Sequence, residues 1–355
     1  MPRHLVISLA GIGDTLMATP LIREIPRCLP GVEVEALVLW PGSAQVLAGN
    51  PHLAAVHRHD FLKSGRLTSL RFTLGLRRRR FDVSFTTHPQ GRREYRLITR
   101  LIGARRRLSH AYENQSWIDR WLVTEARPQD YTLTCAANNL ALLRFLQVEP
   151  DATRLRPELF LGPAEQSWAD QWLREHRLEG VPWLGVHVGS GGTKNLALRR
   201  WPAERYAELF PRLLAARPEG RILLFGGPEE QAVHDMLRGR VPDPRVLFPS
   251  TPSLRHAAAL LGHARAFLSV DTAFMHLATA MQVPRQWVIE TPTLNPPVCP
   301  ARSDWIRIPN PGIQGRHLDF YRYDGRPIAG TDAEIRALME RVTVDSVLAA
   351  LLAHA

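Results

Sequence analysis

The sequence has few cysteines and no long apolar segment. Cys28, Cys135 and Cys299 lie far apart and form no C-x-x-C pair, so the sequence predicts neither a disulfide framework nor a zinc site. No apolar run reaches the roughly 18 residues that a membrane-spanning helix needs. The apolar N-terminal stretch is too short and too poorly flanked for a signal peptide, so we expect a cytoplasmic protein.

Lysine is almost absent as well. It occurs only as Lys63 and Lys194, so arginine carries nearly all of the positive charge. The formal net charge of +11 indicates either arginine-biased codon usage or an anionic partner. Arginine-rich segments lie at 77–80, 91–93 and 104–107. Because no helix-turn-helix, RNP-like or zinc-finger pattern is present, we do not expect a nucleic-acid partner.

At 355 residues, the chain is long enough for two domains of ordinary size. Short apolar runs alternate with amphipathic stretches on both sides of a polar, proline-bearing segment at 149–163. We therefore predict an α/β protein with two Rossmann-like domains, at 1–155 and 156–331, whose parallel sheets face a central cleft. A long irregular stretch is expected over 291–331. Two helices are expected over 332–355, where packing back onto the N-terminal domain is one arrangement open to them.

The first strand candidate runs directly into the glycine turn G-I-G-D. A dinucleotide fingerprint would need a third glycine, but Leu16 stands at that position. Gly11 and Gly13 are better explained as residues that let the backbone turn tightly and a substrate approach closely. Asp14 then begins a helix, where it serves as an N-cap, as a general base, or as both. The N-terminus of that helix keeps its carboxylate ionised.

In the second half, the segment H-V-G-S-G-G-T-K-N-L-A-L-R-R-W-P follows a predicted strand. Backbone N–H groups around Ser190, Gly191 and Thr193 are suited to cradle phosphate oxygens. Arg199 and Arg200 are suited to neutralise a departing diphosphate. This segment therefore predicts a binding site for a diphosphate group.

Two further segments place polar residues after predicted strands. Glu229 follows a glycine turn, where its carboxylate can accept hydrogen bonds from nucleoside or sugar hydroxyls. Asp271 and Thr272 begin a helix whose N-terminus attracts phosphate, and His276 lies one turn further on the same face. Each of these residues also has an ordinary structural explanation, as a cap or a buried core histidine. Because all of them follow the carboxyl ends of strands, we expect one site at the switch point of the sheet.

With these motifs, the chain resembles glycosyltransferase family 9, the ADP-heptose:lipopolysaccharide heptosyltransferase family. The resemblance runs from about residue 4 to about residue 300. The segments that carry it are GIGDTLMATPL, FDVSFTTHPQGRREYRLITRLIGARRRLSH, HVGSGG…RRWP, LLFGGPEEQ and SVDTAFMHLATAMQVP. It implies a GT-B fold and an inverting, metal-independent transfer from a nucleotide sugar without a cofactor. The sequence agrees on the metal, because it has no D-x-D pair to hold a divalent ion.

On the acceptor side, the resemblance implies that Asp14 is the catalytic base. The acceptor hydroxyl would bind over Gly13 and Asp14. Lys63, Arg92 and Arg93 are candidates for binding an anionic acceptor, such as a phosphorylated lipid A core. For such a lipid acceptor, peripheral contact with the inner membrane is expected.

On the donor side, the resemblance implies that Arg199 faces the diphosphate, in place of the family's lysine. It implies that Glu229 holds the nucleoside ribose. It also implies that the donor sugar and phosphates lie beside Asp271, Thr272 and His276. The expected reaction moves a heptose from ADP-heptose onto the lipopolysaccharide core or a related glycan.

Three alternatives remain open from the sequence. One is a family member that glycosylates a protein or a small-molecule scaffold. The second is a nucleotide-sugar epimerase on the same fold, in which His187 and His276 would move protons. The third is a basic, non-enzymatic protein that docks on a membrane or on nucleic acid, and this alternative leaves the glycine-turn carboxylates without a role.

Overall fold

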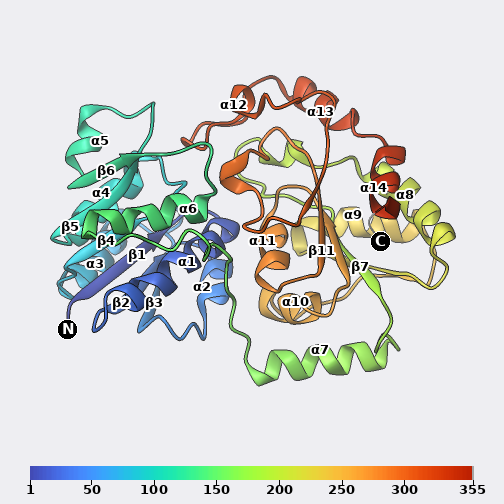
Figure 1. The fold of residues 1–355 in the computed structure, drawn as a ribbon, viewed down its shortest axis with the longest axis horizontal. Coiled ribbons are helices and arrows are strands. Elements are labelled where there is room, and N and C mark those ends of the chain that lie inside the picture. Colours follow the sequence, from blue (N-terminus) through green and yellow to red (C-terminus); the bar gives the residue numbers. More distant parts are fainter. Residues whose placement is uncertain (354–355) are drawn as a thin grey trace. The chain divides into compact units, whose positions relative to one another are not determined.

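The computed structural model describes residues 1–353, which divide into two compact units. Unit 1 comprises Met1–Phe160 and the short segment Arg322–Arg326, and unit 2 comprises the remaining described residues. Within residues 1–353, each unit contains one parallel sheet of six strands with helices packed against it (Figure 1). The predicted fold class, α/β with two parallel sheets, is therefore confirmed. No helix among the described residues is long and apolar enough to cross a membrane.

In unit 1, the strand order is β3-β2-β1-β4-β5-β6. β1 (Arg3–Ser8) pairs with both β2 (Glu33–Val38) and β4 (Val83–Thr86), so the switch point of this sheet lies beside β1. The other strands are β3 (Ala55–Arg58), β5 (Arg106–Ala111) and β6 (Glu125–Pro128). The helices are α1 (Ile12–Cys28), α2 (Pro41–Leu47), α3 (Arg66–Arg77), α4 (Arg93–Ile102), α5 (Trp117–Trp121), α6 (Cys135–Leu140) and the 3₁₀ helix η1 (Ala141–Leu146).

One apolar cluster of unit 1 lies between its sheet and two helices. Leu5, Ile7 and Leu37 point from β1 and β2 toward Leu76 of α3 and Ile102 of α4. These side chains are almost completely buried, as expected for a parallel sheet covered by helices. The cluster therefore fixes α3 and α4 on the same face of the sheet.

The last part of unit 1 differs from the sequence expectation. The sequence indicates one amphipathic helix over 131–147, but the structure has α6 followed by η1. The helix begins after Thr134, whose hydroxyl accepts a hydrogen bond from the Ala137 N–H at 3.2 Å and so caps the first turn. β6 has little strand signal in the sequence, because it is a short edge strand that ends in Pro128.

In unit 2, the strand order is β12-β11-β10-β7-β8-β9. β7 (Trp183–His187) pairs with both β8 (Arg221–Phe225) and β10 (Ala266–Ser269), which places the switch point beside β7. The other strands are β9 (Val246–Leu247), β11 (Arg285–Ile289) and β12 (Ile306–Ile308). The helices are α7 (Pro163–Glu175), η2 (Leu196–Arg199), α8 (Ala203–Ala216), η3 (Pro228–Glu230), α9 (Gln231–Arg240), α10 (Leu254–Leu261), α11 (Ala273–Ala280), η4 (Pro296–Val298), α12 (His317–Phe320), α13 (Asp332–Glu340) and α14 (Val344–Ala353). The stretch 291–331, expected to be irregular, thus adds an edge strand to this sheet.

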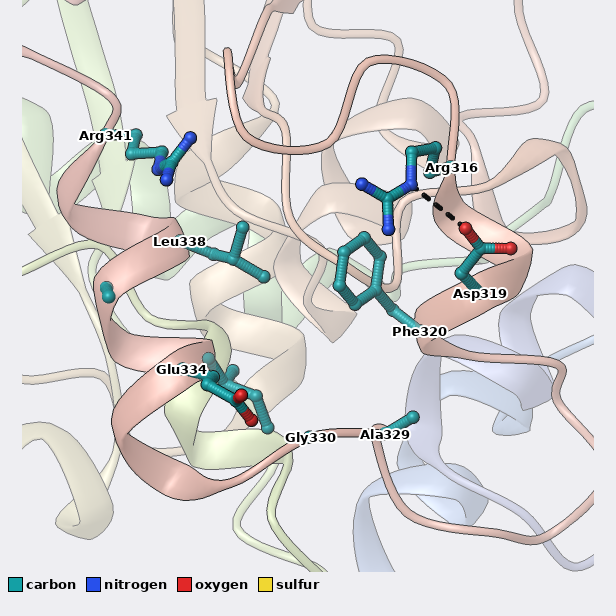
Figure 2. A pocket seen from close by; sticks show the side chains of 10 residues that line it. Arg316, Asp319, Phe320, Ala329, Gly330, Glu334, Leu338 and Arg341 are labelled. Atoms are coloured by element: carbon teal, nitrogen blue, oxygen red, sulfur yellow. Dashed lines mark hydrogen bonds and ion pairs between the residues drawn. The ribbon is translucent and has the colours of Figure 1, made fainter.

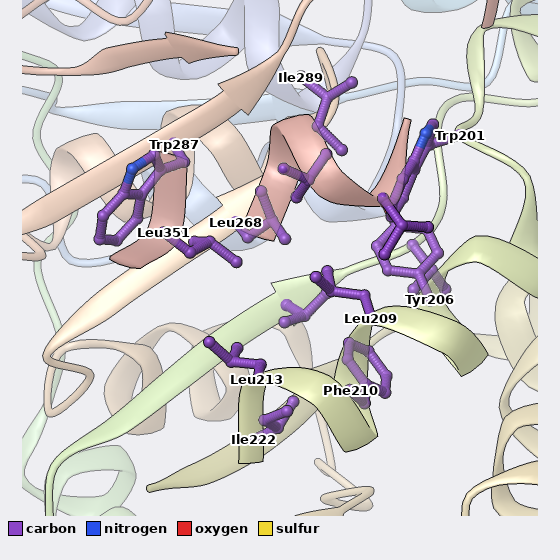
Figure 3. Packing of buried hydrophobic residues seen from close by; sticks show 14 of the residues in the cluster. Trp201, Tyr206, Leu209, Phe210, Leu213, Ile222, Leu268, Trp287, Ile289 and Leu351 are labelled. Atoms are coloured by element: carbon purple, nitrogen blue, oxygen red, sulfur yellow. The ribbon is translucent and has the colours of Figure 1, made fainter. Parts of the chain in front are cut away.

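The C-terminal helices belong to the core of unit 2. Figure 3 shows Leu351 of α14 packed with Leu213 of α8 and Trp287 of β11. The indole N–H of Trp287 donates to the carbonyl of Ala350 at 3.2 Å, and that of Trp201 donates to Val342 at 2.9 Å. The arrangement in which the helices of 332–355 return to the N-terminal domain is therefore corrected, because α8 and β11 bury their apolar faces. The final two residues of that range lie outside the described chain.

Unit 2 also contains a surface pocket between α12 and α13 (Figure 2). Its volume is about 450 Å³, and its lining includes Phe320, Leu338, Arg316 and Arg341. Among the described residues, the lining includes none of the donor-site residues expected from the sequence. The pocket is therefore separate from the switch point beside β7.

Candidate functional site

In unit 1, the turn after β1 holds Asp14 at the start of α1. Gly11 is the N-cap, and its backbone N–H donates to Asp14 Oδ2 at 2.7 Å, so Asp14 is the third residue of a capping box and not the cap itself. Gly11 has an ordinary φ of −72°. A Cβ at this position would lie 3.1 Å from Asp14 Oδ2. A side chain at this position would therefore crowd the Asp14 carboxylate, whereas the backbone conformation itself does not require glycine.

A buried glutamine joins the ends of β1 and β4 beneath this turn. The Gln90 side-chain amide donates to the carbonyls of Ile7 at 2.6 Å and Thr87 at 2.9 Å, and it accepts from the Leu9 N–H at 2.9 Å. These bonds satisfy backbone groups that the diverging strands leave unpaired. Gln90 thereby fixes the backbone from which the Gly11–Asp14 turn starts. Sequence reasoning did not single it out.

The basic residues expected near the acceptor have different surroundings. Lys63 and Arg92 are exposed to solvent. Arg93 instead bonds through Nε to Asp119 Oδ1 at 3.0 Å, and this pairing lowers the pKa of Asp119 to about 2. Burial raises the pKa of the Tyr95 phenol, on which the charges of Arg92 and Asp14 act in opposite directions. Arg92 and Lys63 therefore have side chains available to an acceptor, whereas Arg93 is engaged within the unit.

In unit 2, a buried arginine meets a buried aspartate where β10 ends. Arg199 Nη1 donates to Asp271 Oδ2 at 2.7 Å and to Thr293 Oγ1 at 2.9 Å. The Thr293 hydroxyl in turn donates to Asp271 Oδ2 at 2.6 Å. Only 10% of the Arg199 side chain and 7% of the Asp271 side chain are exposed. The guanidinium charge is therefore fixed in one orientation at the carboxyl edge of the sheet.

The N-terminus of α11 follows directly after Asp271. Thr272 is its N-cap residue, and the Thr272 hydroxyl lies 3.2 Å from His187 Nδ1. The His187 ring stacks on Phe274 with centroids 4.5 Å apart, and burial lowers its pKa to about 3. Burial also lowers the pKa of His276 to about 4. Both imidazoles are therefore neutral at physiological pH.

A second arginine orders the glycine-rich loop after β7. Arg200 Nη2 donates to the Ser190 carbonyl at 2.7 Å and lies 3.7 Å from Glu230 Oε1. Glu230, and not Glu229, is the buried member of the pair: burial raises the pKa of Glu230, whereas the Glu229 side chain is 69% exposed. A Cβ at Gly189 would overlap the Glu230 carboxylate. The loop therefore packs on Glu230 and leaves Glu229 open to solvent.

The structure brings together many of the donor residues expected from the sequence. Arg199 meets Asp271, and Arg200 meets Ser190. Gly191 and Thr193 are exposed in the loop that connects Ser190 to Arg199. Thr293, in contrast, was not expected, because it lies in an irregular stretch with no motif of its own. Within residues 1–353, no group of three or more His, Cys, Asp or Glu is placed to hold a metal ion.

Comparison with known families gives one match over most of the chain. The family model of glycosyltransferase family 9 (heptosyltransferase) matches residues 71–285. The curated protein "Lipopolysaccharide heptosyltransferase 3" of Escherichia coli is 24% identical over 281 residues, which cover 77% of this chain and 78% of that protein.

Solved structures share the fold over almost the whole chain. A family 9 glycosyl transferase from Veillonella parvula superposes with a TM-score of 0.75 at 18% identity, covering 99% of this chain and 96% of its own. The E. coli heptosyltransferase WaaC with ADP-2-deoxy-2-fluoro heptose gives a TM-score of 0.71 at 18% identity, covering 99% and 100%. The two-domain α/β architecture is therefore the GT-B fold that the sequence resemblance implies.

Proposed function

The chain belongs to glycosyltransferase family 9, and we propose that it moves a heptose from ADP-heptose to a hydroxyl of the lipopolysaccharide core, without a metal ion and with inversion at the anomeric carbon. The observation that carries this proposal is the buried Arg199 guanidinium, fixed by Asp271 beside the N-terminus of α11. An arginine and a helix N-terminus together form a site suited to a diphosphate.

The donor diphosphate is proposed to bind at the switch point of unit 2. Arg199 and Arg200 would meet the charge that develops on the leaving diphosphate, together with N–H groups of the Ser190–Thr193 loop and of α11. Both arginines are oriented by hydrogen bonds before any ligand binds. Glu229 is exposed beside this loop and is suited to accept hydrogen bonds from ribose hydroxyls.

Asp14 is proposed as the catalytic base on unit 1. The acceptor oxygen attacks the anomeric carbon and gives its proton to the Asp14 carboxylate, while the bond between that carbon and the diphosphate oxygen breaks and its electron pair leaves with ADP. The Gly11 N–H holds the carboxylate in place at the start of α1. Lys63 and Arg92 would then bind anionic groups of the acceptor.

The relatives support this choice of substrates. The E. coli relative is named for heptosyl transfer to lipopolysaccharide, and one structure with the same fold carries an ADP-heptose analogue. The lipopolysaccharide core is therefore the acceptor that we propose, with a protein or small-molecule acceptor as the alternative within the same reaction.

The epimerase alternative is less well supported by the site. An epimerase would need groups that gain and release protons near the sugar. Burial lowers the pKa of His187 to about 3 and that of His276 to about 4, so neither imidazole carries a proton to donate near neutral pH. The site thus offers fixed cations for a leaving diphosphate and few proton donors.

The test is release of ADP from ADP-heptose in the presence and absence of a heptose-deficient lipopolysaccharide core. We expect ADP only with the acceptor, unchanged turnover in excess EDTA, and an inverted anomeric linkage by NMR. Loss of turnover in EDTA would contradict transfer without a metal ion. Retention of the anomeric configuration would contradict the inverting mechanism. ADP release with a peptide or a small-molecule acceptor alone points to the alternative acceptor.

Asp14→Ala tests the role of Asp14 as the base separately from binding of the donor. We expect kcat to fall by about 10²–10⁴-fold, while the Kd for ADP-heptose stays within about twofold. The matched control is Glu334→Ala, because Glu334 Oε2 accepts the Thr331 N–H at 2.7 Å in the capping box of α13. That variant loses the same kind of cap but should keep full activity. Normal turnover by Asp14→Ala would show that Asp14 is not the base.

A further inference from the structure

Three helices of unit 1, α3, α4 and α5, follow one another as neighbours: α3 packs beside α4, and α4 contacts α5. α3 and α4 pack on the same apolar cluster. α5 is joined to α4 because Arg93 bonds Asp119 and the Arg100 guanidinium lies 5.0 Å from the centre of the Trp121 ring. Side chains that point away from the sheet on these helices therefore share one outer surface.

This outer surface is apolar where soluble proteins usually place polar residues. Trp117 is 76% exposed, Trp121 64% and Leu67 61%. Large exposed side chains that gather on neighbouring helices indicate a binding surface, whereas scattered ones need no explanation. We define the α3–α5 face by the exposed apolar residues of these helices, which are Leu67, Leu70, Leu74, Leu97, Trp117, Ile118 and Trp121.

The apolar residues of α3 follow the period of a helix. Leu67, Leu70 and Leu74 are spaced i, i+3 and i+7, so they lie in one stripe that faces solvent. Phe72 and Leu76 lie on the opposite side and pack on the sheet. α3 thus has two apolar sides, and only the inner one is accounted for by the fold.

The charges around this stripe have one sign. The stretch 61–81 contains seven Arg and Lys residues and no Asp or Glu. Arg71 and Arg78 are exposed on α3 and at its C-terminal end. The acid of α5, Asp119, is buried and paired with Arg93. On α4, Glu94 is exposed three residues before Leu97, so this face carries one acid among a larger number of arginines. A partner for this surface must therefore accept apolar side chains and carry mainly negative charge.

We propose that the α3–α5 face binds the surface of an anionic lipid bilayer. Tryptophan and leucine insert at the boundary between headgroups and acyl chains, and arginines beside them are attracted to anionic headgroups. A protein partner would have to match rings and leucines spread over three helices, whereas a bilayer adapts to their outline.

The placement of this face agrees with a lipid-linked acceptor. Helices of a parallel α/β unit begin at the carboxyl edge of the sheet, so the N-terminal ends of α3 and α5 lie at the edge where Asp14 follows β1. Leu67 and Trp117 stand in the first turn of these two helices. Bilayer contact would thus hold unit 1 with its acceptor edge near the membrane, and this consequence rests on the proposed function.

The test is flotation of the full-length protein with vesicles of phosphatidylcholine alone or with about one third phosphatidylglycerol. We expect the protein to float with the anionic vesicles and to dissociate at high salt. Arg71→Gln with Arg78→Gln should weaken binding by about 25-fold, since each arginine near an anionic surface contributes on the order of a factor of five. Trp117→Ala with Leu67→Gln should weaken it by at least about tenfold.

Matched variants on unit 2 serve as controls. Arg217→Gln with Arg240→Gln removes the same charge from exposed positions, and Leu352→Gln removes an exposed leucine. These variants should bind vesicles within about twofold of the unmodified protein. Equal losses in the two sets would show a general charge effect and overturn the assignment, as would failure to float with anionic vesicles.

Self-association is examined in the same proteins by light scattering. A dimer that dissociates in the α3–α5 face variants would assign the face to a second copy of the chain and overturn the proposal. Vesicle binding uses neither donor nor acceptor, so its failure leaves transfer to a detergent-dispersed acceptor intact. Failure of the proposed transfer would likewise leave vesicle binding unchanged.

Discussion

The Arg199 guanidinium donates to Asp271 Oδ2 at 2.7 Å, and both side chains are almost completely buried. Burial of such a pair contributes little net stability, because desolvation of both charges opposes their attraction. The pair instead fixes the orientation of the Arg199 guanidinium. Under the proposed function, this orientation allows the cation to meet the diphosphate of the donor.

Asp271→Asn should unfold unit 2 more easily, because it leaves the Arg199 charge buried without its counter-charge. We expect the free energy of unfolding to fall by about 3–5 kcal/mol in urea titrations. The control is Asp235→Asn, whose carboxylate pairs with Arg238 at the surface and should cost at most about 1 kcal/mol. Equal effects of the two substitutions would contradict the importance of the buried pair.

Gly11→Ala should displace the Asp14 carboxylate without unfolding unit 1. The new Cβ would lie 3.1 Å from Asp14 Oδ2, so the carboxylate must shift by a few tenths of an ångström. Because proton transfer depends on position, we expect kcat to fall by about 10–100-fold with donor KM nearly unchanged. In the control Gly75→Ala, a helix position whose Cβ meets nothing within 4 Å, kcat should stay the same. An unchanged kcat in Gly11→Ala would argue against Asp14 as the base.

Much of the fold was predictable from periodicity in the sequence. Apolar runs such as that of β1 and β7 are buried on both sides, and this pattern indicated parallel sheets. The sequence also indicated that Arg199 and Asp271 lie at one edge of the sheet, because both residues come after neighbouring strands, but it did not predict the hydrogen bond between them. Residues that carry a motif after a strand were therefore accessible to sequence reasoning.

Other parts of the site carry no local signal. Thr293 bonds Asp271 from an irregular segment, and Gln90 joins β1 to β4 through contacts with residues about 80 positions away. Glu230 is the buried glutamate, and Glu229 the exposed one, because Gly189 has no side chain and leaves room for the Glu230 carboxylate. Such features are determined by tertiary packing, which overrides local propensity, and a single sequence does not encode them as a pattern.

Gly189→Ala should disrupt the loop that is proposed to bind the donor. Its Cβ would overlap the Glu230 carboxylate, which also lies 3.7 Å from the Arg200 guanidinium. We expect a loss of about 1–3 kcal/mol in the free energy of unfolding and a severalfold higher KM for the donor. Gly239→Ala, in α9 with nothing within 4 Å of the new Cβ, is the control and should leave KM unchanged.

Buried histidines should make the protein less stable as the pH falls below about 6.5. Burial lowers the pKa of His187 to about 3 and that of His276 to about 4, so the unfolded chain binds protons that the folded protein does not. Each such histidine therefore removes stability, by about 1.4 kcal/mol per pH unit, as the pH falls from its unfolded pKa to its folded pKa. Above pH 6.5 the contribution is constant.

His187→Gln tests this effect on one side chain. The variant loses the stacking on Phe274 at every pH, but its free energy of unfolding should fall less steeply between pH 6.5 and pH 4 than that of the unmodified protein. The difference in slope, measured by urea unfolding at a series of pH values, should approach about 1.4 kcal/mol per pH unit. Parallel curves for His187→Gln and the unmodified protein would mean that His187 takes up its proton in the folded state, and a protonated His187 would return the epimerase alternative to consideration.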